Sequence, residues 1–149
     1  MCERKSYVIK RIREEERIAD FLRSCDEEFI PTLSLRINIE SYAKKLFQYA
    51  QVYCLVSENQ IFGMCAIYLN NVTEGFITSF NVSKQSQNKG YGKILLQHVL
   101  YEAKQQNYTT ITLEVDKNNV KAITFYKKNS FVIEREYENW LVLKAKLSV

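Results

Sequence analysis

Apolar and polar residues alternate along the chain with two different periods. Where the period is two, the pattern predicts strands, at residues 7–12, 52–58, 61–69, 76–82, 110–115, 131–136 and 140–146. Where the period is about 3.6, it predicts helices, at residues 13–23, 39–50 and 94–106 and from Asn118 or Asn119 to Lys128. The expected order is therefore strand, helix, helix, three strands, helix, strand, helix and two strands.

The links between the predicted strands indicate how the strands pair. Short turns at Asn59-Gln60 and Asn70-Asn71 join three successive strands into an antiparallel meander. The helix predicted between the fourth and fifth strands implies that those two strands lie parallel, joined by a right-handed crossover. The last two strands are expected to form a hairpin around residues 138–139.

Three of the predicted helices carry a clear apolar stripe, as expected for helices that pack on a sheet. Asn38 is expected to cap the second helix. The loop before it holds the only proline, Pro31, among apolar residues, so we expect this loop to pack against another part of the protein. The stripes are Ile18, Phe21 and Leu22 in the first helix, Tyr42, Ala43, Leu46, Phe47 and Ala50 in the second, and Leu95, Leu96, Val99, Leu100 and Ala103 in the third.

The segment from Gln87 to Lys93 lies between a predicted strand and a predicted helix and is suited to an anion. Glycines at Gly90 and Gly92 allow a ligand to approach the backbone closely. The first turn of the helix offers unpaired N–H groups and the positive end of the helix dipole. Lys89 and Lys93 add positive charge to the same place. A tight turn with two solvated lysines is the plain alternative, but we expect a pyrophosphate here.

The spacing of this loop excludes two familiar phosphate motifs and resembles a third. Neither G-x-x-x-x-G-K-[ST] nor G-x-G-x-x-G is present. The remaining pattern, Q-x-x-G-x-G preceded by Val82, resembles the acetyl-CoA pyrophosphate loop of the GCN5-related N-acetyltransferase (GNAT) family. A second motif at the correct distance is similar to the same family: Leu113-Glu114-Val115, then Asn119, Ala122, Phe125-Tyr126 and Phe131. The resemblance rests on motifs over residues 76–131 and on element order elsewhere.

This resemblance implies the fold. We expect an α+β arrangement within the broad α/β class, with a mixed, mostly antiparallel sheet of about seven strands and helices on both faces. At 149 residues the chain is long enough for one core and short for two, so residues 1–149 are expected to form a single acetyltransferase domain.

The resemblance also implies acetyl-CoA as cosubstrate. The pyrophosphate would be held by Gln87, Asn88, Lys89, Gly90, Tyr91, Gly92 and Lys93. Phe80, Asn81 and Val82, where the two parallel strands leave their pairing, would offer backbone groups to the pantetheine arm as to an added strand. A backbone N–H there would also stabilise the oxyanion of the tetrahedral intermediate. Asn119 would bond to the cofactor arm, cap its helix, or do both.

Tyr126 and Glu114 are the expected catalytic residues. A phenol with a pKa of about 10 can donate a proton to a departing thiolate of pKa about 8.5, and the family has a tyrosine in this role. The alternative for Tyr126 is a packing residue, since the chain has ten tyrosines. Glu114 resembles the base of ribosomal-protein alanine acetyltransferases; a solvated or lysine-paired acid is the alternative. A water chain or Glu74 would then take the proton of the attacking amine.

Two positions depart from the family pattern. Asn88 stands where glycine is common, and it fits the loop if its φ stays below zero. Ser130 replaces the usual glycine before Phe131 and predicts a different exit from the helix. Neither change removes a catalytic group, but both raise the question of an altered or weakened site.

Three functions are consistent with these motifs. The first is transfer of acetyl from acetyl-CoA to a primary amine of a small molecule, such as an amino sugar, a polyamine or an amino acid. The second is acetylation of a protein N-terminus or lysine, which the Glu114 segment favours and the region 24–50 disfavours. The third is a non-catalytic CoA-binding or interaction domain, against which the presence of both Tyr126 and Glu114 argues.

Composition excludes several other classes. The net charge of +4 comes from scattered bases, so no nucleic-acid partner is expected. Neither the sole histidine, His98, nor the cysteines show metal-ligand or redox spacing, so no metal is expected, and Cys54 and Cys65 are expected to be buried.

Residues 1–10 lack a signal core and no apolar run is of membrane length, which favours a cytoplasmic protein without a membrane partner. We expect a monomer or homodimer, the latter through an edge strand near Trp140. The cysteines are Cys2, Cys25, Cys54 and Cys65.

Overall fold

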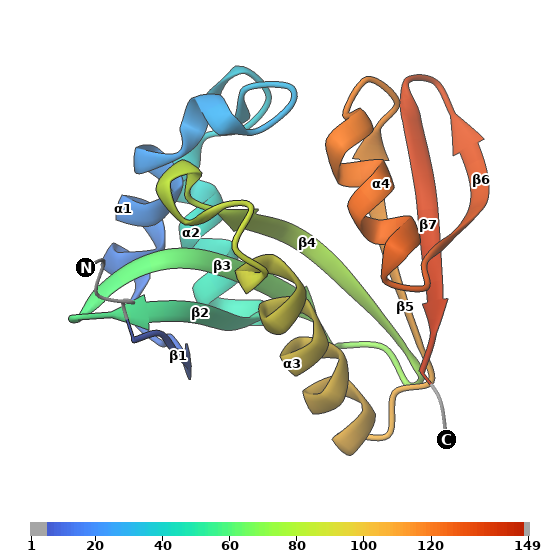
Figure 1. Ribbon diagram of the computed structural model, residues 1–149, viewed down its shortest axis with the longest axis horizontal. Coiled ribbons are helices and arrows are strands. Elements are labelled where there is room, and N and C mark those ends of the chain that lie inside the picture. Colours follow the sequence, from blue (N-terminus) through green and yellow to red (C-terminus); the bar gives the residue numbers. More distant parts are fainter. Residues whose placement is uncertain (1–5, 148–149) are drawn as a thin grey trace.

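The computed structural model describes residues 6–147, whose strands form one seven-stranded sheet in the order β1-β2-β3-β4-β5-β7-β6 (Figure 1). Neighbouring strands are antiparallel except β4 and β5, which are parallel. The α+β class, the element order and the mixed sheet predicted from the sequence are therefore confirmed. The strands are β1 (Val8–Arg11), β2 (Gln51–Ser57), β3 (Gln60–Tyr68), β4 (Glu74–Val82), β5 (Thr110–Asp116), β6 (Val132–Tyr137) and β7 (Trp140–Lys146); the helices are α1 (Glu15–Ser24), α2 (Ile39–Tyr49), α3 (Tyr91–Gln105) and α4 (Val120–Lys128).

The helices cover the two faces of the sheet and bury a separate core on each. On the front face of Figure 1, α3 and α4 pack on the sheet around Leu96, Leu113 and Tyr126, which we call the front core. On the opposite face, α1 and α2 pack around Leu22 and Leu46, which we call the back core. The apolar stripes of the helices supply these contacts, as their spacing predicts. Phe47 is an exception, since it is 44% exposed although it belongs to the predicted α2 stripe.

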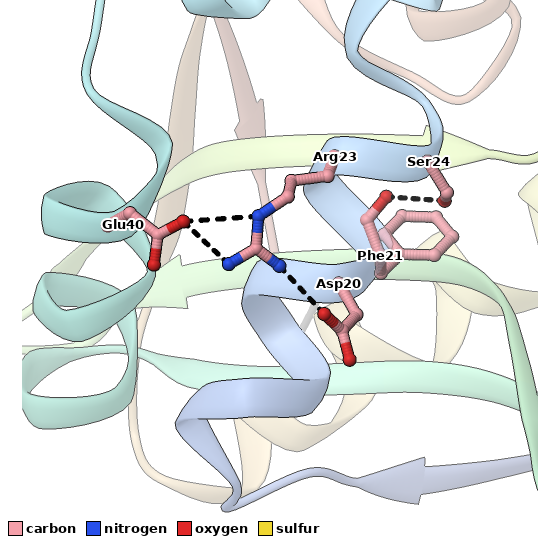
Figure 2. Close-up of polar contacts among 5 residues, drawn as sticks. All are labelled: Asp20, Phe21, Arg23, Ser24 and Glu40. Atoms are coloured by element: carbon pink, nitrogen blue, oxygen red, sulfur yellow. Dashed lines mark hydrogen bonds and ion pairs between the residues drawn. The ribbon is translucent and has the colours of Figure 1, made fainter.

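Polar contacts fix α1 against α2. Figure 2 shows the Arg23 guanidinium of α1 bonded to Glu40 of α2 at 2.6 and 3.1 Å and to Asp20 of its own helix at 2.7 Å. Asn38 caps α2 as predicted, since its Oδ1 accepts a hydrogen bond from the Ser41 N–H at 2.9 Å. The Arg23 contacts are exposed to solvent, so they orient the two helices while the back core supplies most of the stabilisation.

The loop between α1 and α2 follows the predicted packing. It contains two short 3₁₀ turns, η1 (Asp26–Glu28) and η2 (Leu33–Leu35), on either side of Pro31. Leu33 is buried in the back core and Phe29 packs against it. An Asp26 carboxylate accepts hydrogen bonds from the backbone and hydroxyl of Ser34 at 2.7 and 2.6 Å, which ties the two turns together.

Two predicted details of the hairpins are wrong. The β2–β3 turn uses Glu58 and Asn59, with φ of 50° and 64°, rather than Asn59-Gln60. A tight two-residue hairpin turn needs positive φ at its central residues, and Gln60 already pairs with Ser57. The strand that begins at Trp140 is not an edge strand: β7 pairs with β5 along its whole length, and β6 lies outside it.

The end of α4 also differs from the prediction. Ser130 has a φ of 72°, its N–H bonds to the Lys127 carbonyl, and the Phe131 N–H bonds to the Tyr126 carbonyl at 3.1 Å. This is the Schellman arrangement that a glycine gives at the same place. The expected different exit is therefore wrong, and Ser130 adopts the left-handed conformation in place of glycine at a cost of about 1 kcal/mol.

A bulge in β4 interrupts the predicted alternation of residues 76–82. Ile77 pairs with Ile67 and Ser79 pairs with Ala66, so Thr78 has no partner on β3. Because of this extra residue, Ile77 lies on the same face as Val82, which the plain alternation assigned to opposite faces. Pairing with β5 ends at Ile77 opposite Leu113, so Thr78 lies beyond that ladder as well.

Tyr42 of α2 binds the bulged residue. Its phenol donates to the Thr78 carbonyl at 3.0 Å, and it shares a second hydrogen bond with the Thr78 hydroxyl at 2.7 Å. Burial raises the pKa of Tyr42 to about 12, against the opposing effect of the Thr78 hydrogen bond. The phenol therefore stays protonated and available as a donor.

Replacing Tyr42 with phenylalanine should lower the free energy of unfolding by about 1 kcal/mol, because the part-buried Thr78 carbonyl loses its donor. Urea unfolding followed by circular dichroism measures the change. Tyr49→Phe on the same helix is the matched control, since that side chain is 60% exposed and its hydroxyl has no partner in the described part of the chain. Equal stability of the two variants would contradict the assigned role of Tyr42.

Candidate active site

The sheet opens between β4 and β5. The two strands pair only from Glu74 opposite Thr110 to Ile77 opposite Leu113, and they separate beyond that point, as Figure 1 shows. A cavity of about 930 Å³ occupies the opening. Residues 80–82 remain paired with β3 on one side, and on the other side they line the cavity with residues 113–116 of β5. The cavity therefore runs along the free edge of β4, where the sequence predicts the pantetheine arm.

The predicted anion loop lies at one end of this cavity. Gly90 caps the start of α3 with a φ of 83°, and a Cβ added at Gly92 would lie 3.5 Å from the Phe125 ring. Gly90 therefore uses the left-handed backbone that glycine permits, whereas the added Cβ at Gly92 would be in ordinary contact with Phe125, so packing within the protein does not require glycine there. Asn88 has a φ of 62°, so the condition under which it was expected to fit, a negative φ, is not met. Asparagine is among the residues that tolerate this conformation best.

The loop residues differ in how they face the cavity. Tyr91 packs on Tyr7 with ring centroids 4.2 Å apart, and Lys89 is exposed outside the cavity lining. Their side chains therefore point elsewhere, although their backbone belongs to the loop. The members of the loop that line the cavity are Gln87, Asn88, Gly90, Gly92 and Lys93.

Gln87 connects the loop to both walls of the cavity. Its Nε2 donates to the Val82 carbonyl at 2.7 Å, and its Oε1 accepts from Lys121 Nζ of α4 at 2.9 Å. The amide thus holds the loop in place, and it brings a further cation to the same end of the cavity. Lys121 was not a candidate from the sequence, because it is one lysine in a charged helix and nothing local distinguishes it.

Asn119 lies at the N-terminus of α4 and caps it. Its Oδ1 accepts a hydrogen bond from the Ala122 N–H at 3.2 Å. The capping role left open by the sequence is therefore present. Asn119 also lines the cavity, as do Ala122 and Tyr126 on the same face of the helix.

Tyr126 lies in an aromatic cluster on the front core. Its ring meets Phe80, Phe125 and Phe131 edge to face, with centroids 5.4 to 6.0 Å apart. The residue is 7% exposed and lines the cavity. Burial, with a smaller effect of Cys65, raises the pKa of Tyr126 well above the usual value for a phenol. The hydroxyl is therefore protonated at any working pH.

Glu114 lines the opposite wall of the cavity and is bound by a tyrosine. The Tyr137 phenol donates a hydrogen bond to the Glu114 carboxylate, which raises the pKa of Tyr137. Tyr137 was missed by sequence reasoning, because it comes from the following hairpin. Glu74, the alternative base, lies at the closed end of the β4–β5 pair and faces Lys144 at 3.5 Å. It is outside the lining of this cavity, so Glu114 lies closer to the opening between β4 and β5 than Glu74 does.

The segment between α1 and α2 closes the far end of the cavity. Arg36 of this segment lies over the Trp140 ring of β7, with the guanidinium 5.5 Å from the ring centroid. The contact joins the α1–α2 segment to the start of β7. Both residues line the cavity.

The histidine and the buried cysteines lie outside the cavity lining. His98 packs on Tyr53 and lies 3.7 Å from Glu102 on the same helix, as a packing residue. Burial raises the pKa of the Cys54 thiol to about 12 and also raises that of Cys65, so both are inert. Within residues 6–147 no group of three or more metal-ligating side chains lies together, and no helix there is long and apolar enough to cross a membrane. Cys2 and the rest of 1–5 lie outside the described residues.

A sheet split beside a loop suited to an anion, with a deep cavity in the split, is the arrangement that the resemblance to the acetyltransferase family implies. A sequence model of the acetyltransferase (GNAT) family matches residues 12–131, and the chain belongs to that family. The resemblance seen in the motifs is thereby confirmed. Membership makes the protein an N-acetyltransferase that uses acetyl-CoA, an acyltransferase as predicted.

Solved structures share the fold at low sequence identity. A ribosomal-protein alanine N-acetyltransferase from Escherichia coli is 16% identical, with a TM-score of 0.80 over 97% of this chain and 96% of that one. The PaiA N-acetyltransferase of Thermoplasma acidophilum, solved with coenzyme A, is 17% identical, with a TM-score of 0.79 over 95% and 99%. A GNAT acetyltransferase from Elizabethkingia anophelis with acetyl-CoA bound is 17% identical, with a TM-score of 0.71 over 95% and 98%. No curated protein sequence matches the chain.

The hydrogen bond between Tyr137 and Glu114 can be measured directly. Glu114→Gln should lower the pKa of Tyr137 toward the ordinary value of about 10, because a neutral amide no longer favours the protonated phenol. A pH titration of carbon-labelled tyrosine by NMR follows this group. Glu136→Gln is the matched control on the same strand as Tyr137, since Glu136 faces Lys117 at 3.6 Å. The same Tyr137 pKa in wild type and Glu114→Gln would rule out the contact.

Proposed function

We propose that the protein acetylates a primary amine of a small molecule, by direct attack of the amine on the acetyl-CoA thioester. One observation carries this proposal: a single cavity runs through the opened sheet, from the cationic loop on the front face to an aromatic and acidic region bordered by the α1–α2 segment. Donor and acceptor can therefore enter from opposite sides and meet at the strand edge. Such an arrangement suits a ternary complex without a covalent enzyme intermediate.

The donor would lie along the front part of the cavity. Its pyrophosphate would bind the loop from Gln87 to Lys93, where Lys93 and Lys121 supply positive charge. The amides of the pantetheine arm would pair with the free side of β4 at Phe80, Asn81 and Val82. A backbone N–H in that stretch would stabilise the oxyanion, and Asn119 would contact the arm beside its capping bond.

Glu114 and Tyr126 would handle the proton transfers. Glu114, directly or through water, takes one proton of the attacking ammonium, and the neutral nitrogen forms a bond to the carbonyl carbon. The C–S bond then breaks and Tyr126 gives its proton to the departing sulfur. The nitrogen, which still carries one proton more than the amide, passes that proton to the Tyr126 oxygen directly or through water, and this restores the phenol. Tyr137 would hold the Glu114 carboxylate in position through its hydrogen bond. The elevated pKa of Tyr126 keeps its hydroxyl protonated, and it also makes this phenol a weaker acid toward the departing sulfur than an ordinary phenol.

A protein N-terminus is the second candidate acceptor. The similarity of the Leu113-Glu114-Val115 segment to ribosomal-protein alanine acetyltransferases supports it. Against it stands the contact of Arg36 with Trp140, which spans the acceptor end of the cavity and restricts a wide polypeptide. A small amine passes such a contact more readily. A non-catalytic CoA-binding domain is less well supported, because Tyr126 and Glu114 both line the cavity.

The remaining expectations stay predictions. Cys25, Cys54 and Cys65 are free, buried thiols, which is consistent with the reducing cytoplasm expected from the sequence. One domain over residues 1–149, and a monomer or homodimer, are expected as before. Pairing of two copies would have to use β1 or β6, the edges of the described sheet, and not the strand at Trp140.

Binding of acetyl-CoA tests the donor site. Gly92→Ala should leave the melting temperature nearly unchanged, because the added Cβ meets Phe125 and Val82 at ordinary contact distances of 3.5 and 3.7 Å. The same Cβ lies in the path of the donor, so the affinity for acetyl-CoA should fall about tenfold or more. Calorimetry with acetyl-CoA, CoA and a mononucleotide measures this. Absence of acetyl-CoA binding by the wild type would reject the donor site.

Tyr126→Phe tests the acid. We expect kcat to fall about 100-fold while the Kd for acetyl-CoA stays the same, because only the proton donor is lost. Since the pKa of Tyr126 lies well above 10, loss of activity at high pH in the wild type should not come from this residue. Tyr101→Phe is the control, an exposed tyrosine on α3 outside the cavity lining. Full activity of Tyr126→Phe would assign the proton to water.

A further inference from the structure

Arg36 is the only arginine among the described residues that line the cavity. Its backbone is fixed at the end of η2, where the N–H groups of Arg36 and Ile37 both bond to the Leu33 carbonyl at 3.1 Å. Leu33 is buried in the back core, whereas Arg36 is exposed. The fold therefore holds an accessible cation at a fixed place on the cavity wall.

The guanidinium of Arg36 contacts an aromatic ring but no acceptor. It lies over Trp140, 5.5 Å from the ring centroid. A guanidinium carries several N–H donors in a planar fork, and no hydrogen bond or ion pair joins those of Arg36 to another residue of the described chain. Arg23 shows the contrast, since its donors meet the carboxylates of Asp20 and Glu40. The donors of Arg36 are therefore available to a ligand.

The acids that line the cavity do not neutralise Arg36. They are Glu28, Glu114 and Asp116, and none of them forms an ion pair with it in the part of the chain that the structure describes. Glu114 accepts a hydrogen bond from the Tyr137 phenol, and Asp116 Oδ1 accepts one from the Asn118 N–H at 2.8 Å. An anion for this guanidinium must therefore come from the ligand.

Arg36 lies close to the proposed base. Trp140, which the guanidinium covers, pairs with Asp116 of β5 and with Tyr137 of β6. Tyr137 binds Glu114, which stands two residues before Asp116 on β5. Paired strands lie about 5 Å apart, and residues follow one another every 3.3 Å or so, roughly, along a strand. The cation and the base are therefore within the length of one small molecule.

We propose that Arg36 binds an anionic group of the acceptor, a carboxylate or a phosphate, so that the acceptor is an amine that also carries negative charge. This rests on the proposed function, since it names the substrate class of the same site. The amine lies near Glu114 and attacks the thioester. The anionic group accepts two N–H donors of the guanidinium, a geometry that fits carboxylate and phosphate alike. Trp140 supports the guanidinium through its ring.

Binding measurements test this without relying on turnover. Calorimetry on the wild-type protein, with and without CoA, compares amines with and without a negative charge. The pairs are the ω-amino acids from glycine to aminohexanoate with their carboxamides, and aminoalkyl phosphates with the corresponding amino alcohols. We expect at least one anionic amine to bind about tenfold or more tightly than its neutral counterpart. Failure of every anionic amine to do so would overturn the proposal.

The two sets of ligands distinguish the source of the anion. A preference confined to the amino acids would assign a carboxylate to the acceptor. A preference confined to the aminoalkyl phosphates would assign a phosphate. Either result supports Arg36 as the residue that binds the anionic group.

Arg36→Gln removes the charge from the cavity wall. It should abolish the preference for the anionic amine, while the affinity for the neutral amine, the Kd for acetyl-CoA and the melting temperature change little, because Arg36 is exposed. Arg36→Lys keeps the charge but loses the planar fork, so it should retain part of the preference. Weaker acetyl-CoA binding in Arg36→Gln would assign Arg36 to the donor and would count against the proposal.

Arg135→Gln is the matched control. Its guanidinium also lies over an aromatic ring, 5.2 Å from the centroid of Tyr137, but Arg135 is outside the cavity lining. This variant should keep the preference for the anionic amine. Loss of the preference in both variants would show a general effect of charge and would reject a specific role of Arg36.

The acceptor proposal and the proposed function fail in different ways. If acetyl-CoA binds and neutral amines are acetylated as well as anionic ones, the proposed function stands and the role of Arg36 is wrong. If anionic amines bind through Arg36 and acetyl-CoA does not bind, Arg36 stands as a recognition residue and the proposed function is wrong. In the expected case kcat/KM for the anionic amine falls in Arg36→Gln mainly through KM, since Arg36 does not take part in the chemistry.

Discussion

The pair of hydrogen bonds between Tyr42 and Thr78 makes the opening of the sheet possible. Every backbone polar group in the interior of a protein needs a partner, and at Thr78 both neighbouring strands have left the ladder. A phenol from α2 supplies the missing donor. Because that helix is held by the back core and by Arg23, the position of the free strand edge depends on the helices behind the sheet. The helices on the back face therefore help to hold the cavity that opens between β4 and β5.

Local sequence patterns were sufficient for the elements and for most of their order. Periodicity identified every strand and helix, and the strand–helix–strand connection gave the single parallel pair. The errors arose where long-range pairing decides the outcome. β7 lies between β5 and β6 because β5 pairs with β7, and nothing in the sequence of the last hairpin says which of its two strands makes that pairing. The bulge at Thr78 depends on the register between β4 and β3. The turn at Glu58-Asn59 was shifted by one residue, because glutamate gives no sign of a positive φ.

The same contrast between local and long-range information applies to the residues of the candidate site. Residues within the two motifs, including Asn119, Glu114 and Tyr126, were found because each motif lies on one continuous stretch that borders the cavity. Lys121, Tyr137 and Arg36 were missed, since each reaches the cavity from an element whose own sequence carries no signal. Asn88 and Ser130 show a further limit. Both stand where the family commonly has glycine, and both adopt the left-handed backbone that is usual for glycine. The backbone geometry is therefore the one that glycine would give, although the residues differ.

The division of the interior into two cores has a consequence for how this enzyme can diverge. The loop and α4 belong with the front core, whereas the segment that borders the acceptor end packs on the back core. Substitutions within residues 26–37 at positions outside the back core, unlike the buried Leu33, therefore alter this border of the cavity without changing the front core beneath α3 and α4. During evolution, the amine that such an enzyme accepts can therefore change through substitutions in a short segment, while the residues that bind the donor stay the same.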